Sequence, residues 1–186
     1  PFTVPACVVT VSDRCSRGAA DDRSGPLAAE LVAAALPGAT VARALVPDGA
    51  DSVRAAIVGA LRDGARLVVT TGGTGVGPRD RTPEGTAGLL DREIPGIAEQ
   101  IRSRGATVTP HAVLSRGLVG VVDPGPLSAE GAIIVNLPGS TGGVRDGSEV
   151  VLPLVEHVLD QIVGGALMTV PAAGRVVSAT VTSDVV

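Results

Sequence analysis

Residues 67–84 read Leu-Val-Val-Thr-Thr-Gly-Gly-Thr-Gly-Val-Gly-Pro-Arg-Asp-Arg-Thr-Pro-Glu, and the rest of the chain can be interpreted around this segment. It opens with apolar and β-branched residues, which are typical of a parallel strand buried on both faces. Four glycines follow within six residues, and they let the backbone turn sharply and bring N–H groups close to a ligand. Thr82 is the predicted N-cap of a helix over residues 83–91, with Pro83 at its first position. A strand, a glycine loop and a helix start form an anion-binding arrangement.

The loop matches neither of two common nucleotide-binding patterns. The chain contains no lysine, which excludes a Walker A phosphate loop. Pro78 stands where the third glycine of Gly-x-Gly-x-x-Gly would fall, which argues against a dinucleotide fingerprint. Asp80 lies beside the predicted anion site, and an acidic residue in that position indicates a metal ion.

Composition narrows the classes of partner. A chain of 186 residues is long enough for one domain with a substantial core. Phe2 is its one aromatic residue, so stacking on nucleic-acid bases is excluded. The net charge of −4 also argues against a nucleic-acid surface, so local arginines must attract any anionic ligand.

The cysteines and the hydropathy pattern indicate neither zinc nor a membrane. Cys7 and Cys15 do not have the spacing of a zinc site or a Cys-x-x-Cys motif. No apolar run has membrane-spanning length, so we expect a cytoplasmic protein without a membrane partner. We expect one functional domain over residues 1–168, followed by a tail over 169–186 whose role the sequence leaves open.

The order of predicted elements indicates a three-layer α/β/α fold with a mainly parallel sheet. Strands are predicted over residues 6–11, 41–46, 67–71, 119–123 and 132–135, with helical segments between most of them. Four polar or glycine-rich clusters directly follow strands: Ser12-Asp13, Asp48, Gly72 to Asp80, and Asn136 to Thr141. Because ligands of such sheets bind beyond the carboxyl ends of the strands, we expect these clusters to share one site.

The chemistry of these clusters favours phosphoryl or nucleotidyl transfer. They combine two acids, two glycine-rich turns and nearby arginines, and they lack a Ser-His-Asp triad. Such groups suit a reaction in which positioning and charge neutralisation dominate. His111 and His157 have neither a paired nucleophile nor metal-ligand spacing, and Glu99 is expected to be solvated.

Several of these segments together resemble the molybdopterin-binding family of molybdenum cofactor biosynthesis. The resemblance rests on Thr71-Gly72-Gly73-Thr74-Gly75, Pro78-Arg79-Asp80 and Thr82-Pro83-Glu84, and it extends from about Val8 to Leu159. Further matches are Pro47-Asp48 and Ala112 to Arg116. The turn at residues 136–141 departs from the family's Asn-x-Pro-Gly-x-Pro pattern, because Thr141 replaces the second proline.

The resemblance implies transfer of AMP from Mg-ATP to the terminal phosphate of molybdopterin, with release of pyrophosphate. It implies that Asp48 and Asp80 are catalytic and hold Mg²⁺. The Gly72–Gly75 loop, which includes Gly73 and Thr74, would hold the nucleotide phosphates. The pterin side would be formed by Ser115, Arg116, Asn136, Pro138, Gly139 and Ser140, and Ser12 and Asp13 would border the pocket.

Two alternatives remain open at this point. The first is a non-catalytic molybdopterin-binding or scaffolding protein of the same fold. The second is a hydrolase related to nicotinamide-recycling enzymes, which is disfavoured because the chain lacks a long additional domain. The resemblance also implies a homo-oligomer, a homotrimer more often than a hexamer, and contact with other molybdenum cofactor enzymes.

Overall fold

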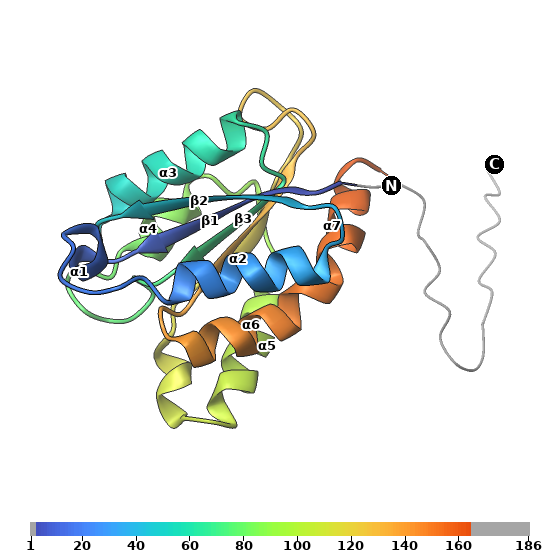
Figure 1. The fold of residues 1–186 in the computed structure, drawn as a ribbon. Helices are drawn as coiled ribbons and strands as arrows, with labels where there is room; N and C mark the ends of the chain where they lie inside the picture. Colours follow the sequence, from blue (N-terminus) through green and yellow to red (C-terminus); the bar gives the residue numbers. More distant parts are fainter. Residues whose placement is uncertain (1–2, 165–186) are drawn as a thin grey trace, which may run out of the picture.

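The computed structural model describes residues 3–164 of the chain, and Figure 1 shows how their helices and strands are arranged. The predicted tail over residues 169–186 therefore lies outside the described residues. The elements in chain order are β1 Pro5–Val11, α1 Asp13–Ser16, α2 Ser24–Ala35, β2 Thr40–Val46, α3 Ala50–Arg62, β3 Leu67–Thr71, α4 Thr82–Ala87, β4 Arg92–Glu93, α5 Pro95–Ala106, η1 Pro110–Leu114, β5 Val119–Val122, β6 Ala132–Leu137, α6 Thr141–Val151, η2 Leu152–Leu154 and α7 Val155–Ile162.

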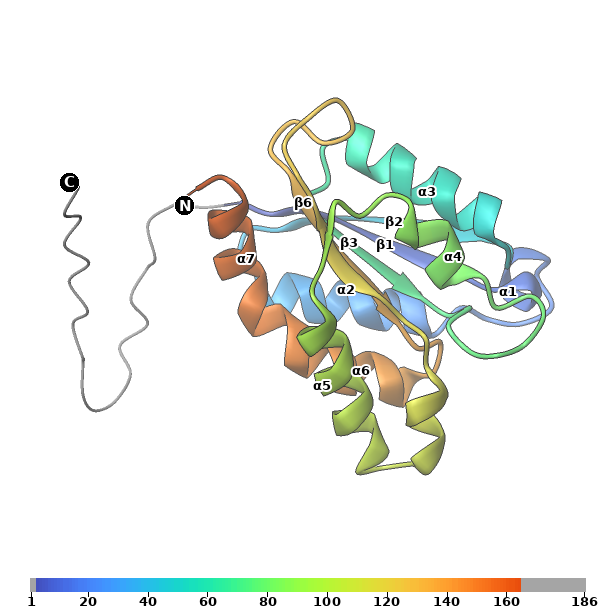
Figure 2. The ribbon, with the colours of Figure 1, turned by 180° about the vertical axis from the view of Figure 1, so that it is seen from behind.

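Residues 3–164 form a six-stranded sheet with the order β2-β1-β3-β6-β5-β4. The first four of these strands are mutually parallel, whereas β5 runs antiparallel to both β6 and β4. Figures 1 and 2 show α3 and α4 on one face of the sheet and α2, α5, α6 and α7 on the other. The predicted three-layer fold with a mainly parallel sheet is confirmed.

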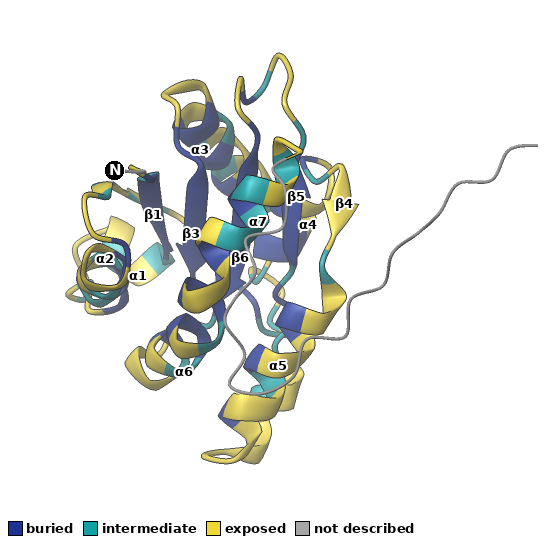
Figure 3. Ribbon diagram, turned by 90° about the vertical axis from the view of Figure 1, so that its right-hand side faces the viewer, coloured by how far each residue is buried: buried dark blue, intermediate teal, exposed yellow. Residues whose placement is uncertain are grey.

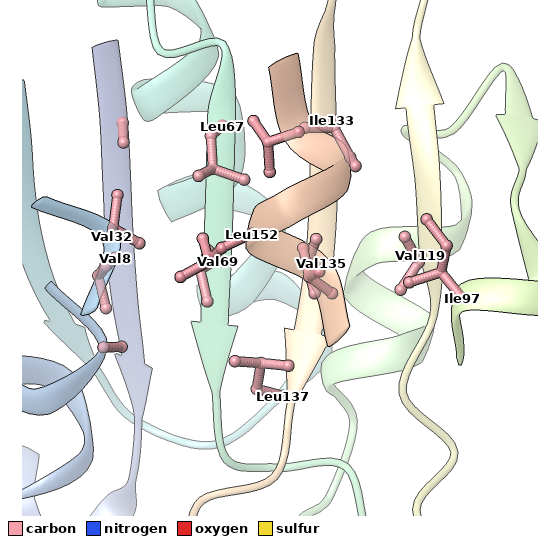
Figure 4. Packing of buried hydrophobic residues seen from close by; sticks show 14 of the residues in the cluster. Val8, Val32, Leu67, Val69, Ile97, Val119, Ile133, Val135, Leu137 and Leu152 are labelled. Atoms are coloured by element: carbon pink, nitrogen blue, oxygen red, sulfur yellow. The ribbon is translucent and has the colours of Figure 1, made fainter. Parts of the chain in front are cut away.

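Two hydrophobic cores lie on opposite faces of the sheet because neighbouring strand residues point in opposite directions. Val8, Val69 and Val135 belong to the core under α2, α5, α6 and α7, part of which Figure 4 shows. Val9 and Val68 belong to the core under α3. Figure 3 shows that β1, β3 and β6 are buried between helices whose outer surfaces are exposed, whereas β4 at the edge of the sheet is exposed.

The direction in which the chain adds strands to the sheet reverses at β1. β1 leads through α2 to its neighbour β2, and the chain then crosses back through α3 to β3 on the other side of β1. In open α/β sheets ligands bind beyond the strand carboxyl ends at such a switch point. The loops after β1, β2, β3 and β6 all emerge at this edge.

Two details around β3 differ from the sequence prediction. The helix after the glycine loop covers only Thr82–Ala87, because Gly88 ends it before the chain enters the short edge strand β4. Arg81 is the N-cap residue, and the Thr82 hydroxyl donates instead to the carbonyl of Gly72 at 2.9 Å.

No helix within residues 3–164 is both long and apolar enough to cross a lipid bilayer.

Candidate active site

The glycine loop after β3 has a conformation that its first two residues require. Gly72 and Gly73 have φ values of 97° and 65°. A Cβ atom at Gly72 would lie 2.4 Å from the carbonyl oxygen of Val11, and one at Gly73 would lie 2.4 Å from the Thr82 hydroxyl. Glycine is therefore needed at both positions for conformational and steric reasons. Thr82 holds the loop, since its N–H also donates to the carbonyl of Gly73 at 3.0 Å.

The loop presents backbone donors that the protein does not use. Within residues 3–164, the N–H groups of Gly73, Thr74 and Gly75 make no hydrogen bond. Successive N–H groups without acceptors form a concave anion-binding surface. The predicted phosphate-binding loop thus has the donors that its proposed role needs.

A second donor-rich turn lies directly against the first. It begins after β6, and Ser140 caps α6 by accepting a hydrogen bond from the N–H of Gly143 at 3.0 Å. A Cβ atom at Gly139 would lie 3.1 Å from the Cα of Gly72, so the two turns are in contact. The N-terminus of α6 therefore brings its own unpaired N–H groups and partial positive charge next to the glycine loop.

Asp13 and Asp48 pair with each other across the ends of β1 and β2. The N–H of Asp13 donates to Asp48 Oδ2 at 2.8 Å, and the N–H of Asp48 donates to Asp13 Oδ1 at 3.1 Å. Arg79 forms two hydrogen bonds of 3.1 Å with the Asp13 carboxylate. These bonds lower the pKa of Asp13 below its ordinary value. Arg79 thereby fastens the tip of the glycine loop to the two strand ends.

The two predicted metal ligands border the glycine loop. Asp48 Oδ1 lies 3.4 Å from the position of a Cβ at Gly73 and accepts no hydrogen bond from a described residue. Asp80 is held inside the loop, where its Oδ2 accepts the N–H of Gly77 at 2.9 Å. Asp80 Oδ1 accepts no hydrogen bond from residues 3–164. Each acid thus keeps one oxygen available beside the loop.

This donor set fits magnesium better than a metal held by the protein alone. Among residues 3–164, no group of three or more His, Cys, Asp or Glu side chains could hold a metal ion. Magnesium is usually bound by one or two carboxylates together with substrate phosphates and water. Two carboxylates beside a loop with unpaired N–H donors meet that requirement, whereas zinc would need additional nitrogen or sulfur ligands.

Arg116 contacts the protein more extensively than the sequence suggested. Its guanidinium donates to the carbonyls of Gly75 at 2.8 Å and Asp80 at 2.7 Å, and to Glu84 at 2.6 Å. The N–H of Arg116 also donates to the carbonyl of Thr74 at 2.8 Å. Phosphate contact by Arg116 stays a prediction, and its observed contacts brace the glycine loop against α4.

The Glu84–Arg116 pair should make stability depend on pH. The hydrogen bond from Arg116 lowers the pKa of Glu84. The contribution of this pair to the free energy of unfolding is therefore complete above the ordinary glutamate pKa of about 4.3. It is lost as the pH falls through the lowered pKa of Glu84. Both side chains are 37% exposed, so solvent limits the effect to about 1 kcal/mol or less. Glu84→Gln should reduce the loss of unfolding free energy between about pH 5 and pH 3.

Urea unfolding at several pH values measures this difference. The matched control is Glu99→Gln, which removes an exposed carboxylate that makes no ion pair or hydrogen bond with a described residue. The control should retain the wild-type dependence on pH. Equal curves for Glu84→Gln and the wild type would show that the pair contributes nothing.

Asn136 supports the site from behind. It lies within β6 and is 2% exposed. Its amide donates to the hydroxyls of Thr70 and Thr86 and accepts the N–H of Leu118 at 3.1 Å. These bonds join β6 to β3, to α4 and to the start of β5. Direct ligand contact by Asn136 stays a prediction that its burial does not favour.

Several other predicted residues line one open cavity of about 460 Å³. Thr74 and Gly75 border it from the glycine loop, and Pro138 and Ser140 border it from the second turn. Ser115 completes this rim, with its hydroxyl 3.4 Å from that of Thr74. Ser12 is placed elsewhere, since it caps α1 by accepting the N–H of Cys15 at 3.2 Å.

The sequence did not reveal the far wall of this cavity or the role of Arg79. That wall comprises Ile101, Arg102, Gly105, Val108, Thr109, His111, Ala112 and Leu114 from α5, η1 and their connection, with Gly142, Gly143 and Asp146 from α6. The apolar residues that α5 contributes are equally consistent with a hydrophobic core, so their pattern in the sequence did not indicate a cavity. Two indications were available: Ala112 and Leu114 lie in the segment from Ala112 to Arg116 that matches the family, and Gly142 and Gly143 follow the Asn-x-Pro-Gly turn.

Comparison with protein families gives a match over most of the chain. Residues 7–157 match the family described as "Probable molybdopterin binding domain". The chain is 41% identical over 155 residues to a molybdenum cofactor biosynthesis bifunctional protein of Synechococcus elongatus, covering 83% of this chain and 46% of the relative. It is 36% identical over 161 residues to a molybdopterin adenylyltransferase of Pyrococcus furiosus, covering 86% of this chain and 91% of that relative.

Solved structures show the same architecture. The molybdopterin biosynthesis enzyme MoaB from Thermus thermophilus superposes with a TM-score of 0.74 and 43% identity, covering 87% of this chain and 97% of the other. The relatives differ in length, and the chain spans less than half of the bifunctional protein but nearly all of the Pyrococcus enzyme.

Proposed function

The chain belongs to the molybdopterin-binding domain family, and from this membership we propose that it acts in molybdenum cofactor biosynthesis as a molybdopterin adenylyltransferase. An oxygen of the molybdopterin phosphate attacks the α-phosphorus of ATP. The bond from that phosphorus to the bridging oxygen breaks, and pyrophosphate leaves. The relative from Pyrococcus furiosus, which is named for this activity, supports the assignment.

The contact between the two donor-rich turns is the observation that carries the proposal. A protein that only binds molybdopterin needs one phosphate site, whereas a transferase needs two sites that are adjacent. The Gly72–Gly75 loop is bordered by Asp48 and Asp80, while the second turn opens into the cavity. The closeness of Gly72 and Gly139 would bring the two phosphates together for reaction.

The residues have distinct roles in this mechanism. The unpaired N–H groups of Gly73, Thr74 and Gly75 bind the nucleotide phosphates. Asp48 and Asp80 would hold Mg²⁺, which when bound would neutralise phosphate charge that otherwise keeps the two substrates apart. The N-terminus of α6 orients the molybdopterin phosphate for in-line attack. Arg79, Arg116 and Thr82 keep the loop in the conformation that these contacts require.

Magnesium removal tests whether the second phosphate site exists. We expect ATP binding to the wild type to weaken about tenfold or more when EDTA replaces Mg²⁺, because two nearby carboxylates would then face uncompensated phosphates. Molybdopterin binding should change much less, because Asp48 and Asp80 border the glycine loop and not the second turn at Gly139–Ser140. Isothermal titration calorimetry with each ligand, with and without Mg²⁺, measures both.

The same titrations separate the transferase from the non-catalytic binder. If the protein binds molybdopterin but shows no magnesium-dependent ATP binding, the transferase should be abandoned for the binder. A homotrimeric assembly, contact with other molybdenum cofactor enzymes and a cytoplasmic location remain predictions that these measurements do not address.

A further inference from the structure

The cavity beside the two turns has chemically different parts. Near the sheet it is bordered by hydroxyls and backbone donors of Thr74, Ser115 and Ser140. Farther along α5 and η1 its wall is largely apolar, with Ile101 and Leu114 among the lining residues. An anion fits the first part, and a flat ring system fits the second.

Asp146 is the one acidic residue among the described residues that line this cavity. It lies on the same face of α6 as Gly142 and Gly143, which are four and three residues earlier and also line the cavity. Asp146 is six positions after the cap Ser140, so the two are about 9 Å apart along the helix axis. This separation leaves room for a ring system between the anion-binding turn and the carboxylate.

The Asp146 carboxylate has hydrogen-bonding capacity that the protein leaves unused. Its side chain is 19% exposed, and its single interaction within residues 3–164 is an ion pair with Arg104 Nε at 3.7 Å. Arg104 also contacts Glu149, so its charge is shared between two carboxylates. No buried side-chain oxygen among residues 3–164 lacks a partner, so the Asp146 oxygens are open to solvent and can accept donors from a ligand in the cavity.

We infer that Asp146 selects ligands whose ring carries two adjacent N–H donors, as the 2-amino-4-oxo pyrimidine edge of a pterin does. The two carboxylate oxygens can accept both N–H groups side by side, in the bidentate manner of an amidine-like donor. A 2-oxo ring such as that of lumazine replaces one donor with an acceptor, which the carboxylate repels. This inference rests on the proposed function, since it assumes that the cavity holds the pterin.

Fluorescence titration can measure this preference directly. The probes are the monophosphates of 6-hydroxymethylpterin and of the corresponding 6-hydroxymethyllumazine, both of which fluoresce. The chain contains no tryptophan or tyrosine, so protein emission does not interfere. The wild type should bind the pterin phosphate about tenfold to a hundredfold more tightly, as expected for a lost hydrogen bond to a charged group. This comparison requires no variant.

Asp146→Asn should bring the ratio of the two affinities close to one. The asparagine has the same shape, and its amide can turn to offer one donor and one acceptor to either ring. Glu149→Gln is the matched control, since Glu149 shares Arg104 but does not line the cavity. It should retain the wild-type ratio. Ser140→Ala should weaken both probes equally, because Ser140 lies at the anion-binding end.

The outcomes distinguish the inference from the function on which it rests. Equal binding of the two probes by the wild type would overturn the role of Asp146 while leaving molybdopterin binding intact. An Asp146→Asn variant that keeps the pterin preference would also overturn it. If the wild type binds neither probe, the proposed function itself is contradicted.

Discussion

Replacing Asp80 by asparagine is expected to lower the rate of adenylyl transfer by about a hundredfold to a thousandfold, the usual effect of removing a strong electrostatic contribution to catalysis. The substitution removes the charge that would hold Mg²⁺ but keeps an oxygen that can accept the N–H of Gly77. The loop should therefore keep its conformation, and the unfolding free energy should change little. Pyrophosphate release in the presence of molybdopterin and Mg-ATP measures the rate.

Asp91→Asn provides the matched control. Asp91 also uses a carboxylate oxygen to accept a loop N–H, that of Asp123 at 2.8 Å. It lies beside the end of β5, level with the start of β6, and therefore at the opposite end of the strands from the candidate site. Its substitution should leave the transfer rate unchanged. A normal rate for Asp80→Asn would remove Asp80 from the mechanism.

Gly142→Leu is expected to weaken molybdopterin binding by about a hundredfold, because it would cover the N–H groups at the start of α6 and cost charge-assisted hydrogen bonds. Gly142 lines the cavity, and a Cβ atom there would meet no atom within 4 Å. The side chain thus extends into the ligand space without disturbing the core. Stability should be unchanged or slightly higher, since glycine is unfavourable within helices.

Gly96 offers the same local environment away from the site. It is the second residue of α5, as Gly142 is of α6, and its Cβ would also meet no atom within 4 Å. Gly96→Leu should bind molybdopterin like the wild type. Retained binding by Gly142→Leu, measured by calorimetry, would place the phosphate elsewhere.

The backbone of the site could be predicted because its signals are local. The continuous apolar runs that become β1, β3 and β6 are buried on both faces, and the polar clusters that follow them meet at one edge. The sharp turn at positions 72 and 73 could also be predicted from local sequence, because glycine readily adopts the positive φ values that both residues have. The short strand β4 carries no such pattern, since two exposed residues have no periodicity.

The side-chain contacts were harder to predict because they join distant parts of the chain. Arg116 and Asn136 follow the expected motifs, yet the first braces the glycine loop and the second is buried among Thr70 and Thr86. A polar residue near a strand end can contact either a ligand or the protein, and the sequence does not separate these cases. Arg79 pairs with Asp13, which is 66 positions away in the sequence, and Asp146 pairs with Arg104, which is 42 positions away.

The central claim is tested most directly by incubating the purified full chain with molybdopterin and Mg-ATP and analysing the products by mass spectrometry. We predict adenylylated molybdopterin and an equal amount of pyrophosphate, with no product when Mg²⁺ is removed and little with Asp80→Asn. Molybdopterin that remains bound but unmodified, with ATP unconsumed, would contradict the transferase and leave a protein that binds molybdopterin without reacting it.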